Sequence, residues 1–249
     1  MIDWKAPLRE CRICPRACGI DRTAGKRGFC GAGALVRVAR TMLHRWEEPC
    51  LIGAHGAGAV FFSHCTLRCV YCQNHEISRG ERGDLLSVEE LAARFLTLES
   101  QGAATLDLVT PTHYTPQILA ALELARTAGF SRPVVWNTSG YETVETISLL
   151  KGHVDIYLPD LKYDTEESAR RFSTAPGYAA AAYAALSAMV AQVGAVRFAP
   201  DGRLLSGVLV RHLVLPGHRR ESIAIVCRLW ETFGDTIQLS LMLSLIHIS

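Results

Sequence analysis

The sequence predicts an α/β protein, a partial TIM-like (β/α)6 barrel preceded by a small cysteine-rich, metal-binding appendage. Six short apolar runs rich in β-branched and aromatic residues follow one another from residue 58 onward. Segments with helical periodicity lie between these runs, which indicates parallel strands joined by right-handed crossovers. Eight of the nine cysteines lie before residue 73, so metal or redox chemistry is expected in the first third of the chain.

Length and composition indicate one main core. The chain has 249 residues, of which 49% are hydrophobic and 20% are charged. We expect a cysteine-rich segment over residues 1–50 and a core domain over residues 51–243. The formal net charge of +2 gives no broad basic field, so nucleic acid is not expected as a partner. The sequence shows neither a signal peptide nor a long apolar run, which favours a cytoplasmic protein without a membrane partner.

The predicted strands are apolar runs bounded by turn residues. They cover residues 58–63, 106–111, 133–139, 154–160, 207–216 and 236–243. Residues 1–50 are instead rich in Cys, Arg and Gly and lack a sustained period. We therefore expect loops in that segment, held together by a bound metal.

The predicted helices carry recognisable start and stop signals. Ser87 with Glu90 three residues later forms a capping-box pattern that opens a helix over residues 87–102. A second helix over residues 115–129 has an early proline and ends on a glycine. The alanine-rich stretch over residues 177–194 is a strong helix by propensity and belongs to the outer layer of the barrel.

A tight cysteine motif directly follows the first predicted strand. The string "CTLRCVYC" places Cys65, Cys69 and Cys72 in a Cys-x-x-x-Cys-x-x-Cys spacing. Thiolates are the natural ligands of iron–sulfur clusters, and barrel enzymes keep their chemistry at the carboxyl ends of the strands. Three ligands would leave one iron of a four-iron, four-sulfur cluster open. The alternative is a zinc or structural cluster site that takes a fourth ligand from His64, His75 or Cys50.

A second cysteine group lies in the N-terminal segment. Its four members are Cys11, Cys14, Cys18 and Cys30. Four thiolates within twenty residues suit a closed zinc site or an auxiliary iron–sulfur cluster equally well. Two roles are therefore possible for this group. The metal acts as a structural scaffold, or it is a cluster that relays electrons or contacts the substrate.

The motifs together resemble the radical S-adenosylmethionine (SAM) superfamily, in particular uncharacterised proteins similar to pyruvate formate-lyase activating enzyme. They are "EEP", "GAVFFSHCTLRCVYCQNHEIS", "LVTPTHYTPQI", "NTSGYE", "VDIYLPDLKY" and "VRHLVLPGH", spread over nearly the whole chain. The resemblance implies a 4Fe-4S cluster and SAM as cofactors. It also implies an oxidoreductase that reductively cleaves SAM to a 5'-deoxyadenosyl radical, with activation of a glycyl-radical enzyme as the candidate activity.

The resemblance also implies roles for residues at the strand ends. Tyr71 matches the position that packs beside the SAM adenine, and residues 137–140 match a segment that contacts the ribose. Asp160 and Lys162 match a segment near SAM, and Arg211 matches an arginine that pairs with the SAM carboxylate. The expected cofactor-binding set is Tyr71, Thr110, His113, Asn137, Ser139, Gly140, Asp160, Lys162 and Arg211.

The ordinary alternatives for these residues are structural. A Thr or Ser at a strand end is often a helix cap, Asp160 and Lys162 can pair on a surface loop, and a lone His is more often structural. Family resemblance alone implies a low-potential electron donor such as flavodoxin or ferredoxin, and a protein substrate.

Two other functions compete with the activating-enzyme hypothesis. One is a metal-stabilised, non-catalytic binding module in which both cysteine groups hold zinc. The other is a radical SAM enzyme that modifies RNA or a peptide, of which the RNA version is disfavoured because no basic, aromatic-interleaved stripe is present. The chain ends in "LSLIHIS", which departs from the family and resembles translated adapter sequence, so we expect residues 244–249 to be a non-native tail.

Overall fold

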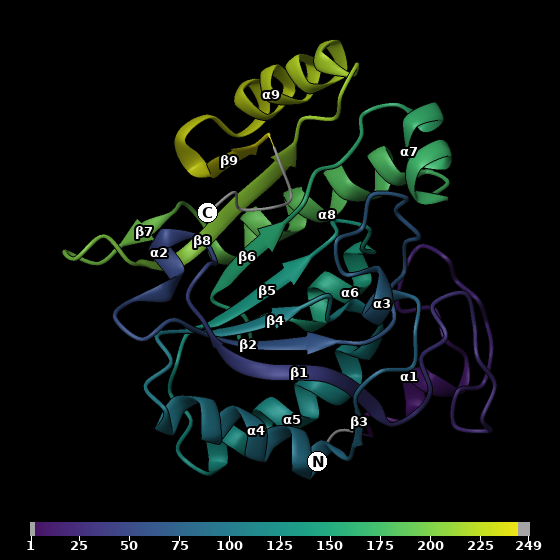
Figure 1. The fold of residues 1–249 in the computed structure, drawn as a ribbon, viewed down its shortest axis with the longest axis vertical. Coiled ribbons are helices and arrows are strands. Elements are labelled where there is room, and N and C mark those ends of the chain that lie inside the picture. Colours follow the sequence, from purple (N-terminus) through teal and green to yellow (C-terminus); the bar gives the residue numbers. More distant parts are fainter. Residues whose placement is uncertain (1–2, 244–249) are drawn as a thin grey trace.

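The computed structural model describes residues 3–243, so the expected tail at residues 244–249 lies outside the described residues. Its centre is a sheet in which six strands run parallel in the order of the chain (Figure 1). These strands are β2 (Ala57–Phe62), β4 (Leu106–Val109), β5 (Val134–Thr138), β6 (Ile156–Pro159), β8 (Leu204–Leu213) and β9 (Gln238–Met242). The six predicted parallel strands are therefore confirmed, with bounds that differ by a few residues.

Antiparallel strands flank the parallel set. Strand β1 (Val36–His44) pairs with β2 and carries β3 (Asp84–Leu86) on its other side, while β7 (Arg197–Phe198) pairs with β8. The edge of β2 therefore pairs with β1. Because β9 does not pair with β2, the barrel is not closed. This arrangement is the expected α/β fold of parallel strands with crossover helices.

Residues 1–50 were predicted to be dominated by loops, and this is wrong for one segment, because Val36–His44 is a full strand of the main sheet. Its first half alternates between buried Val36 and Val38 and less buried neighbours. The rest is only partly buried, so the period-two signal fades along the strand. Pairing with β2 along its length determines the conformation of this strand.

Helices connect successive parallel strands and cover the outside of the sheet (Figure 1). The longer ones are α4 (Val88–Ser100), α5 (Thr115–Thr127), α6 (Val144–Leu149), α7 (Glu166–Ser173), α8 (Tyr178–Val193) and α9 (Arg219–Phe233). Shorter turns of helix are α1 (Ala6–Arg9), α2 (Pro49–Ile52), α3 (His75–Ser78), η1 (Thr112–Tyr114) and η2 (Gly234–Thr236). The predicted capping box of α4 is confirmed, since Ser87 accepts from the Glu90 backbone and Glu90 accepts from the Ser87 backbone.

The core lies between the sheet and this helical layer. Fully buried aromatic side chains such as Trp136, Tyr157 and Phe95 pack with aliphatic residues of the strands and helices in one large cluster. A second, smaller cluster contains other strand residues, among them Ile156 and Leu158. The N-terminal loops lie beside α3, at the end of the sheet where the parallel strands terminate (Figure 1). Within residues 3–243, no helix combines the length and the apolar character needed to cross a membrane.

Candidate functional site

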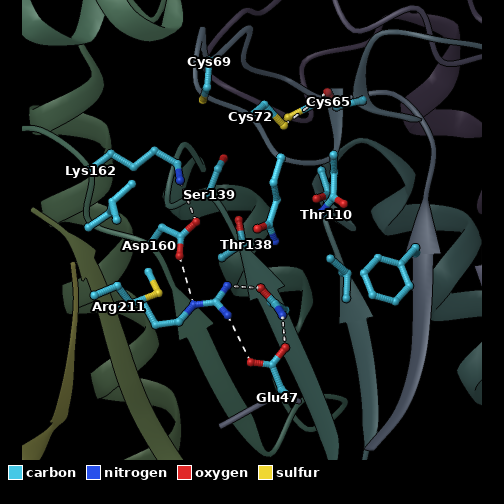
Figure 2. A pocket seen from close by; sticks show the side chains of 18 of the residues that line it. Glu47, Cys65, Cys69, Cys72, Thr110, Thr138, Ser139, Asp160, Lys162 and Arg211 are labelled. Atoms are coloured by element: carbon cyan, nitrogen blue, oxygen red, sulfur yellow. Dashed lines mark hydrogen bonds and ion pairs between the residues drawn. The ribbon is translucent and has the colours of Figure 1, made fainter. Parts of the chain in front are cut away.

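A large cavity opens at the carboxyl ends of the parallel strands and extends into the barrel. Its volume is about 1050 Å³, which lies at the upper end of the usual range for ligand pockets. Figure 2 shows Cys65, Cys69 and Cys72 at one end of this cavity and Glu47 at the other. The predicted cysteine loop and the predicted polar strand ends therefore meet in one place.

Each sulfur of the central loop has a hydrogen-bond donor beside it. The Leu67 amide donates to Cys65 Sγ at 3.4 Å, and Ser173 Oγ donates to Cys69 Sγ at 2.9 Å. The hydroxyl of Ser78 lies 3.5 Å from Cys72 Sγ. Such donors stabilise thiolates that ligate a cluster.

Burial favours the neutral thiol form of Cys65 and Cys69 in the absence of a metal. It raises the pKa of Cys65 to about 12 and raises the pKa of Cys69 as well. Within the described part of the chain, no three His, Cys, Asp or Glu side chains converge closely enough to hold one metal ion. A cubane needs no such convergence, because each thiolate binds a different iron. Three free, hydrogen-bonded sulfurs around one cavity fit a 4Fe-4S cluster with one open iron.

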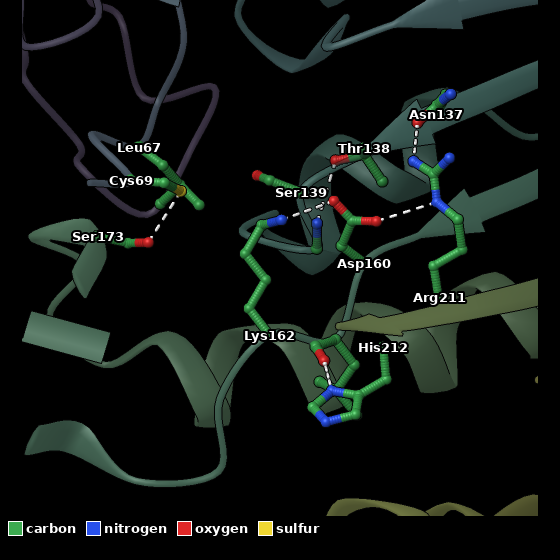
Figure 3. A network of polar contacts seen from close by, with 12 residues as sticks. Leu67, Cys69, Asn137, Thr138, Ser139, Asp160, Lys162, Ser173, Arg211 and His212 are labelled. Atoms are coloured by element: carbon green, nitrogen blue, oxygen red, sulfur yellow. Dashed lines mark hydrogen bonds and ion pairs between the residues drawn. The ribbon is translucent and has the colours of Figure 1, made fainter. Parts of the chain in front are cut away.

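Arg211 on β8 is the centre of a polar network in the barrel. Its Nε donates to Asp160 Oδ1 at 3.0 Å, its Nη1 to Glu47 Oε1 at 3.1 Å and its Nη2 to Asn137 Oδ1 at 2.6 Å. Lys162 Nζ donates to the other oxygen of Asp160 at 2.7 Å, so that Asp160 lies between the two cations (Figure 3). The network joins the ends of β5, β6 and β8 to the segment after β1.

Asp160 and Lys162 each stabilise the charged form of the other. Burial by itself would raise the pKa of Asp160, but Lys162 and Arg211 outweigh it and hold that pKa below its usual value. Burial would lower the pKa of Lys162, and Asp160 outweighs it and holds that pKa well above the usual value. The cavity thus presents two cations and their carboxylate partners side by side.

Asp107 on β4 lies beneath this network and was not predicted from the sequence. Burial, and to a lesser extent the nearby Glu47, raise the pKa of Asp107 well above its usual value. Asn137 Nδ2 donates to Asp107 Oδ2 at 3.4 Å, whereas Asp107 Oδ1 is buried and has no hydrogen-bond partner among the described residues. Glu47, which also accepts from Asn137 Nδ2, was likewise missed as a site residue.

A chain of hydroxyl groups links Tyr71 to the Cys69 sulfur, both on the cysteine loop. Tyr71, which lines the cavity, has its Oη 2.5 Å from Tyr163 Oη. Tyr163 Oη is 2.6 Å from Ser173 Oγ, which in turn donates to Cys69 Sγ. Burial raises the pKa of Tyr71 to about 12, so these groups are neutral hydrogen-bonding hydroxyls.

Most residues of the expected cofactor-binding set line the cavity. Those that do are Tyr71, Thr110, Asn137, Ser139, Asp160, Lys162 and Arg211. Gly140 lies behind it with φ +77°, where a Cβ would clash with the Asp160 carbonyl. This glycine lets the ends of β5 and β6 approach each other closely.

His113 is not placed in the large cavity, in contrast to the sequence-based expectation. Because η1 turns its side chain beneath β2, Nε2 lies 2.9 Å from the Ser63 carbonyl oxygen. Burial lowers the pKa of His113 to about 3. The residue lines a separate small cavity together with the N-terminal cysteines.

The four N-terminal cysteines surround that small cavity, whose volume is about 10 Å³. Burial raises the pKa of Cys14 to about 12 and raises the pKa of Cys30. The structure thus brings the predicted group together around one small cavity.

Comparisons with known proteins agree with the site. The model of the radical SAM superfamily matches residues 59–228. "Uncharacterized protein MJ0674" of Methanocaldococcus jannaschii is 29% identical over 221 residues, which cover 85% of this chain and 58% of that protein. The chain thus spans 58% of the length of the curated relative it matches.

Two solved structures of Streptococcus suis SuiB show a more distant similarity. The complex with the precursor peptide SuiA has a TM-score of 0.46 and 13% identity, covering 71% of this chain and 37% of that one. The structure of SuiB itself has a TM-score of 0.44 and 13% identity, covering 75% and 39%. The family model spans more than half of the chain and includes the Cys65–Cys72 loop, so the protein belongs to the radical SAM superfamily.

Proposed function

We propose that this protein is a radical SAM oxidoreductase that abstracts a hydrogen atom from a protein substrate, as an activating enzyme of a glycyl-radical enzyme does. The observation that carries the proposal is the meeting of three free cysteines and a paired-charge network in one cavity. The cavity is large enough to admit part of a substrate beside SAM.

The chain binds and orients its cofactors through named groups. Cys65, Cys69 and Cys72 would hold the cluster, which together with SAM supplies one electron and a 5'-deoxyadenosyl radical for hydrogen abstraction. The methionine end of SAM carries an ammonium and a carboxylate. Asp160 and the two cations beside it offer charges of both signs to these groups. Tyr71 would lie against the adenine.

The electron donor is proposed to be a low-potential flavodoxin or ferredoxin. Arg68 and Arg79 are exposed on the cluster loop and its flank, and Arg79 Nη2 donates to the Cys69 carbonyl at 2.8 Å. Exposed cations beside a cluster favour the approach of an acidic donor protein. The activating-enzyme role itself is supported by the motif resemblance alone.

SAM cleavage is the test of this proposal. The protein is reconstituted anaerobically with iron and sulfide, reduced with dithionite and given SAM, and 5'-deoxyadenosine is measured. We expect product from the wild type and from Cys227→Ser, which alters an exposed cysteine on α9, and none from Cys69→Ala.

Other results would replace the proposal. A fully loaded cluster that yields no 5'-deoxyadenosine would exclude SAM cleavage by this chain. A colourless protein that holds zinc at Cys65, Cys69 and Cys72 would favour the binding module. Tight, salt-dependent RNA binding together with SAM cleavage would instead identify an RNA-modifying enzyme.

A further inference from the structure

The small N-terminal cavity is lined by sulfur and by positive charge. Its four cysteines are Cys11, Cys14, Cys18 and Cys30. Two guanidinium groups, those of Arg16 and Arg22, line the same cavity. All four cysteines are free thiols.

Arg22 is a buried cation whose hydrogen bonds go to neutral groups. It is 1% exposed, and its guanidinium donates to the carbonyls of Gly33 and His113 at 2.6 Å each. Its Nη1 also lies 3.9 Å from Cys11 Sγ. In the part of the chain that the structure describes, no carboxylate oxygen lies within the 4.0 Å ion-pair limit of this guanidinium. A buried charge without a counter-charge is costly, so an anionic group is expected beside it.

Arg16 is a second, partly buried cation that lines the same cavity. Its Nη2 is buried without a hydrogen-bond partner, and its guanidinium carbon lies 3.6 Å from the centre of the Phe29 ring. Over residues 3–243 it too makes no ion pair within the 4.0 Å limit. Two uncompensated guanidiniums therefore face four thiols.

We propose that Cys11, Cys14, Cys18 and Cys30 bind one zinc ion in a closed four-thiolate site that braces the loop carrying Cys65, Cys69 and Cys72. A divalent ion bound by four thiolates is a dianion, which the two guanidiniums of Arg16 and Arg22 neutralise. Binding releases four thiol protons to solvent and involves no electron transfer, so the step is balanced.

The size of the cavity favours a single ion over a cubane. A volume of about 10 Å³ is close to that of one water-sized probe, whereas a cubane brings four irons and four sulfides. As the side chains stand in residues 3–243, three sulfurs do not yet converge on one point. Zinc binding would therefore bring the four sulfurs together by rotations about the χ1 bonds of the cysteines.

The backbone around the cavity is already arranged for close packing on sulfur. At Gly28 a Cβ would lie 2.8 Å from Cys18 Sγ, so the glycine leaves room for this sulfur beside the backbone. The Cys11 amide donates to the Ile20 carbonyl, and the Gly19 amide donates to the Cys11 carbonyl, both at 2.9 Å. These bonds close the first three cysteines into one compact loop.

The same segment contacts the cluster loop at several points. Arg16 Nε donates to the Thr66 carbonyl at 3.0 Å, directly after Cys65. Arg68 Nη2 donates to the Phe29 carbonyl at 3.1 Å, next to Cys30. At Gly31 a Cβ would come within 3.1 Å of the His64 ring. Zinc binding would thus fix the segment on which the cluster loop rests.

The test measures metal content and needs no catalytic assay, so its result is independent of SAM cleavage. Zinc and iron per chain are determined in the reconstituted wild type, Cys14→Ser, Cys69→Ala and the Cys227→Ser control. We expect one zinc in the wild type and the control, and a drop to below about one tenth in Cys14→Ser. Cys69→Ala should lose iron and retain zinc.

Two further measurements guard against misfolding of the serine variant. Cys18→His keeps a zinc-binding side chain and should retain zinc with weakened affinity in a competition with a chelator. Cobalt in place of zinc should give the intense visible bands of tetrahedral thiolate coordination, and Cys14→Ser should lose them. Unchanged zinc in Cys14→Ser, zinc lost only in Cys69→Ala, or about eight irons per wild-type chain would each overturn the proposal.

Discussion

The two cysteine groups of this protein differ in how their surroundings are charged. Around the large cavity the cations are paired, since Arg211 contacts Asp160 and Glu47 while Lys162 contacts Asp160. Around the small cavity Arg16 and Arg22 have no carboxylate within ion-pair distance among the described residues.

We interpret this difference as that between a cavity that binds SAM beside a cluster and a cavity that binds a metal ion alone. A cavity whose own charges are balanced can admit a zwitterion such as the methionine end of SAM without a large change in net charge. A small cavity with uncompensated cations is complete only when an anionic centre forms within it. The number of cysteines follows the same division, because three leave a coordination position open and four close it.

The largest expected effect comes from removing the central cation of the paired network. In Arg211→Met, the carboxylates of Asp160 and Glu47 stay partly buried with their shared partner gone. We expect the free energy of unfolding to fall by about 3–5 kcal/mol, measured by urea denaturation. SAM binding, measured by equilibrium dialysis, should also be lost.

Arg211→Lys is the matched control for this change. An ammonium group keeps the charge but cannot reach Asp160, Glu47 and Asn137 with a planar fork, so a partial loss of stability is expected. A methionine variant as stable as the wild type would show that the paired network contributes nothing to folding.

A smaller effect tests the unpaired cation of the other cavity. Arg22→Met should destabilise the zinc-loaded protein more than the chelator-treated protein, by about 2 kcal/mol, because the ion pair with the metal centre exists only in the loaded form. Parallel urea titrations of both forms measure this difference. Equal losses would limit the role of Arg22 to its bonds with the Gly33 and His113 carbonyls.

The smallest effect concerns the buried proton beneath the paired network. Burial raises the pKa of Asp107 above its ordinary value of 3.8, so the folded state binds more protons than the unfolded state between the two pKa values. Stability contributed by this group is present below the ordinary pKa and is lost as the pH rises through the raised one. Asp107→Asn cannot ionise and should lack this decline.

Urea denaturation of both proteins at about pH 5 and about pH 6 measures this effect. The advantage of Asp107→Asn over the wild type should grow over this pH unit, by up to about 1.4 kcal/mol. A constant difference would mean that Asp107 has the same pKa in the folded and unfolded states.

The parallel part of the fold could be predicted because each strand carries a local signal. Runs such as residues 134–138 open with apolar residues and are buried on both faces of the sheet, and helices such as α4 have a cap that depends on two nearby residues. Strand β1 was missed because its conformation depends on pairing with β2. The hydrophobic periodicity of residues 36–44 gives no sign of this pairing.

Site residues that belong to sequence motifs could be predicted. Site residues whose position depends on tertiary contacts could not. Asp160, Lys162 and Arg211 follow strand ends, and all three line the cavity. Glu47 belongs to the "EEP" motif but was not predicted as a site residue, because its contact with Arg211 spans 164 residues of sequence. His113 lies at the small cavity instead, where its ring is 2.9 Å from the Ser63 carbonyl oxygen, a tertiary contact that the local motif does not encode.

The contact between Glu47 and Arg211 also bears on how the protein folds. It closes a loop of 164 residues, so it forms only after much of the chain has lost its conformational freedom. Contacts of such long sequence separation slow folding, and they form after the local contacts within helices. During synthesis the cysteine loop emerges well before Arg211, so the cavity gains its paired charges only when the eighth strand has joined the sheet.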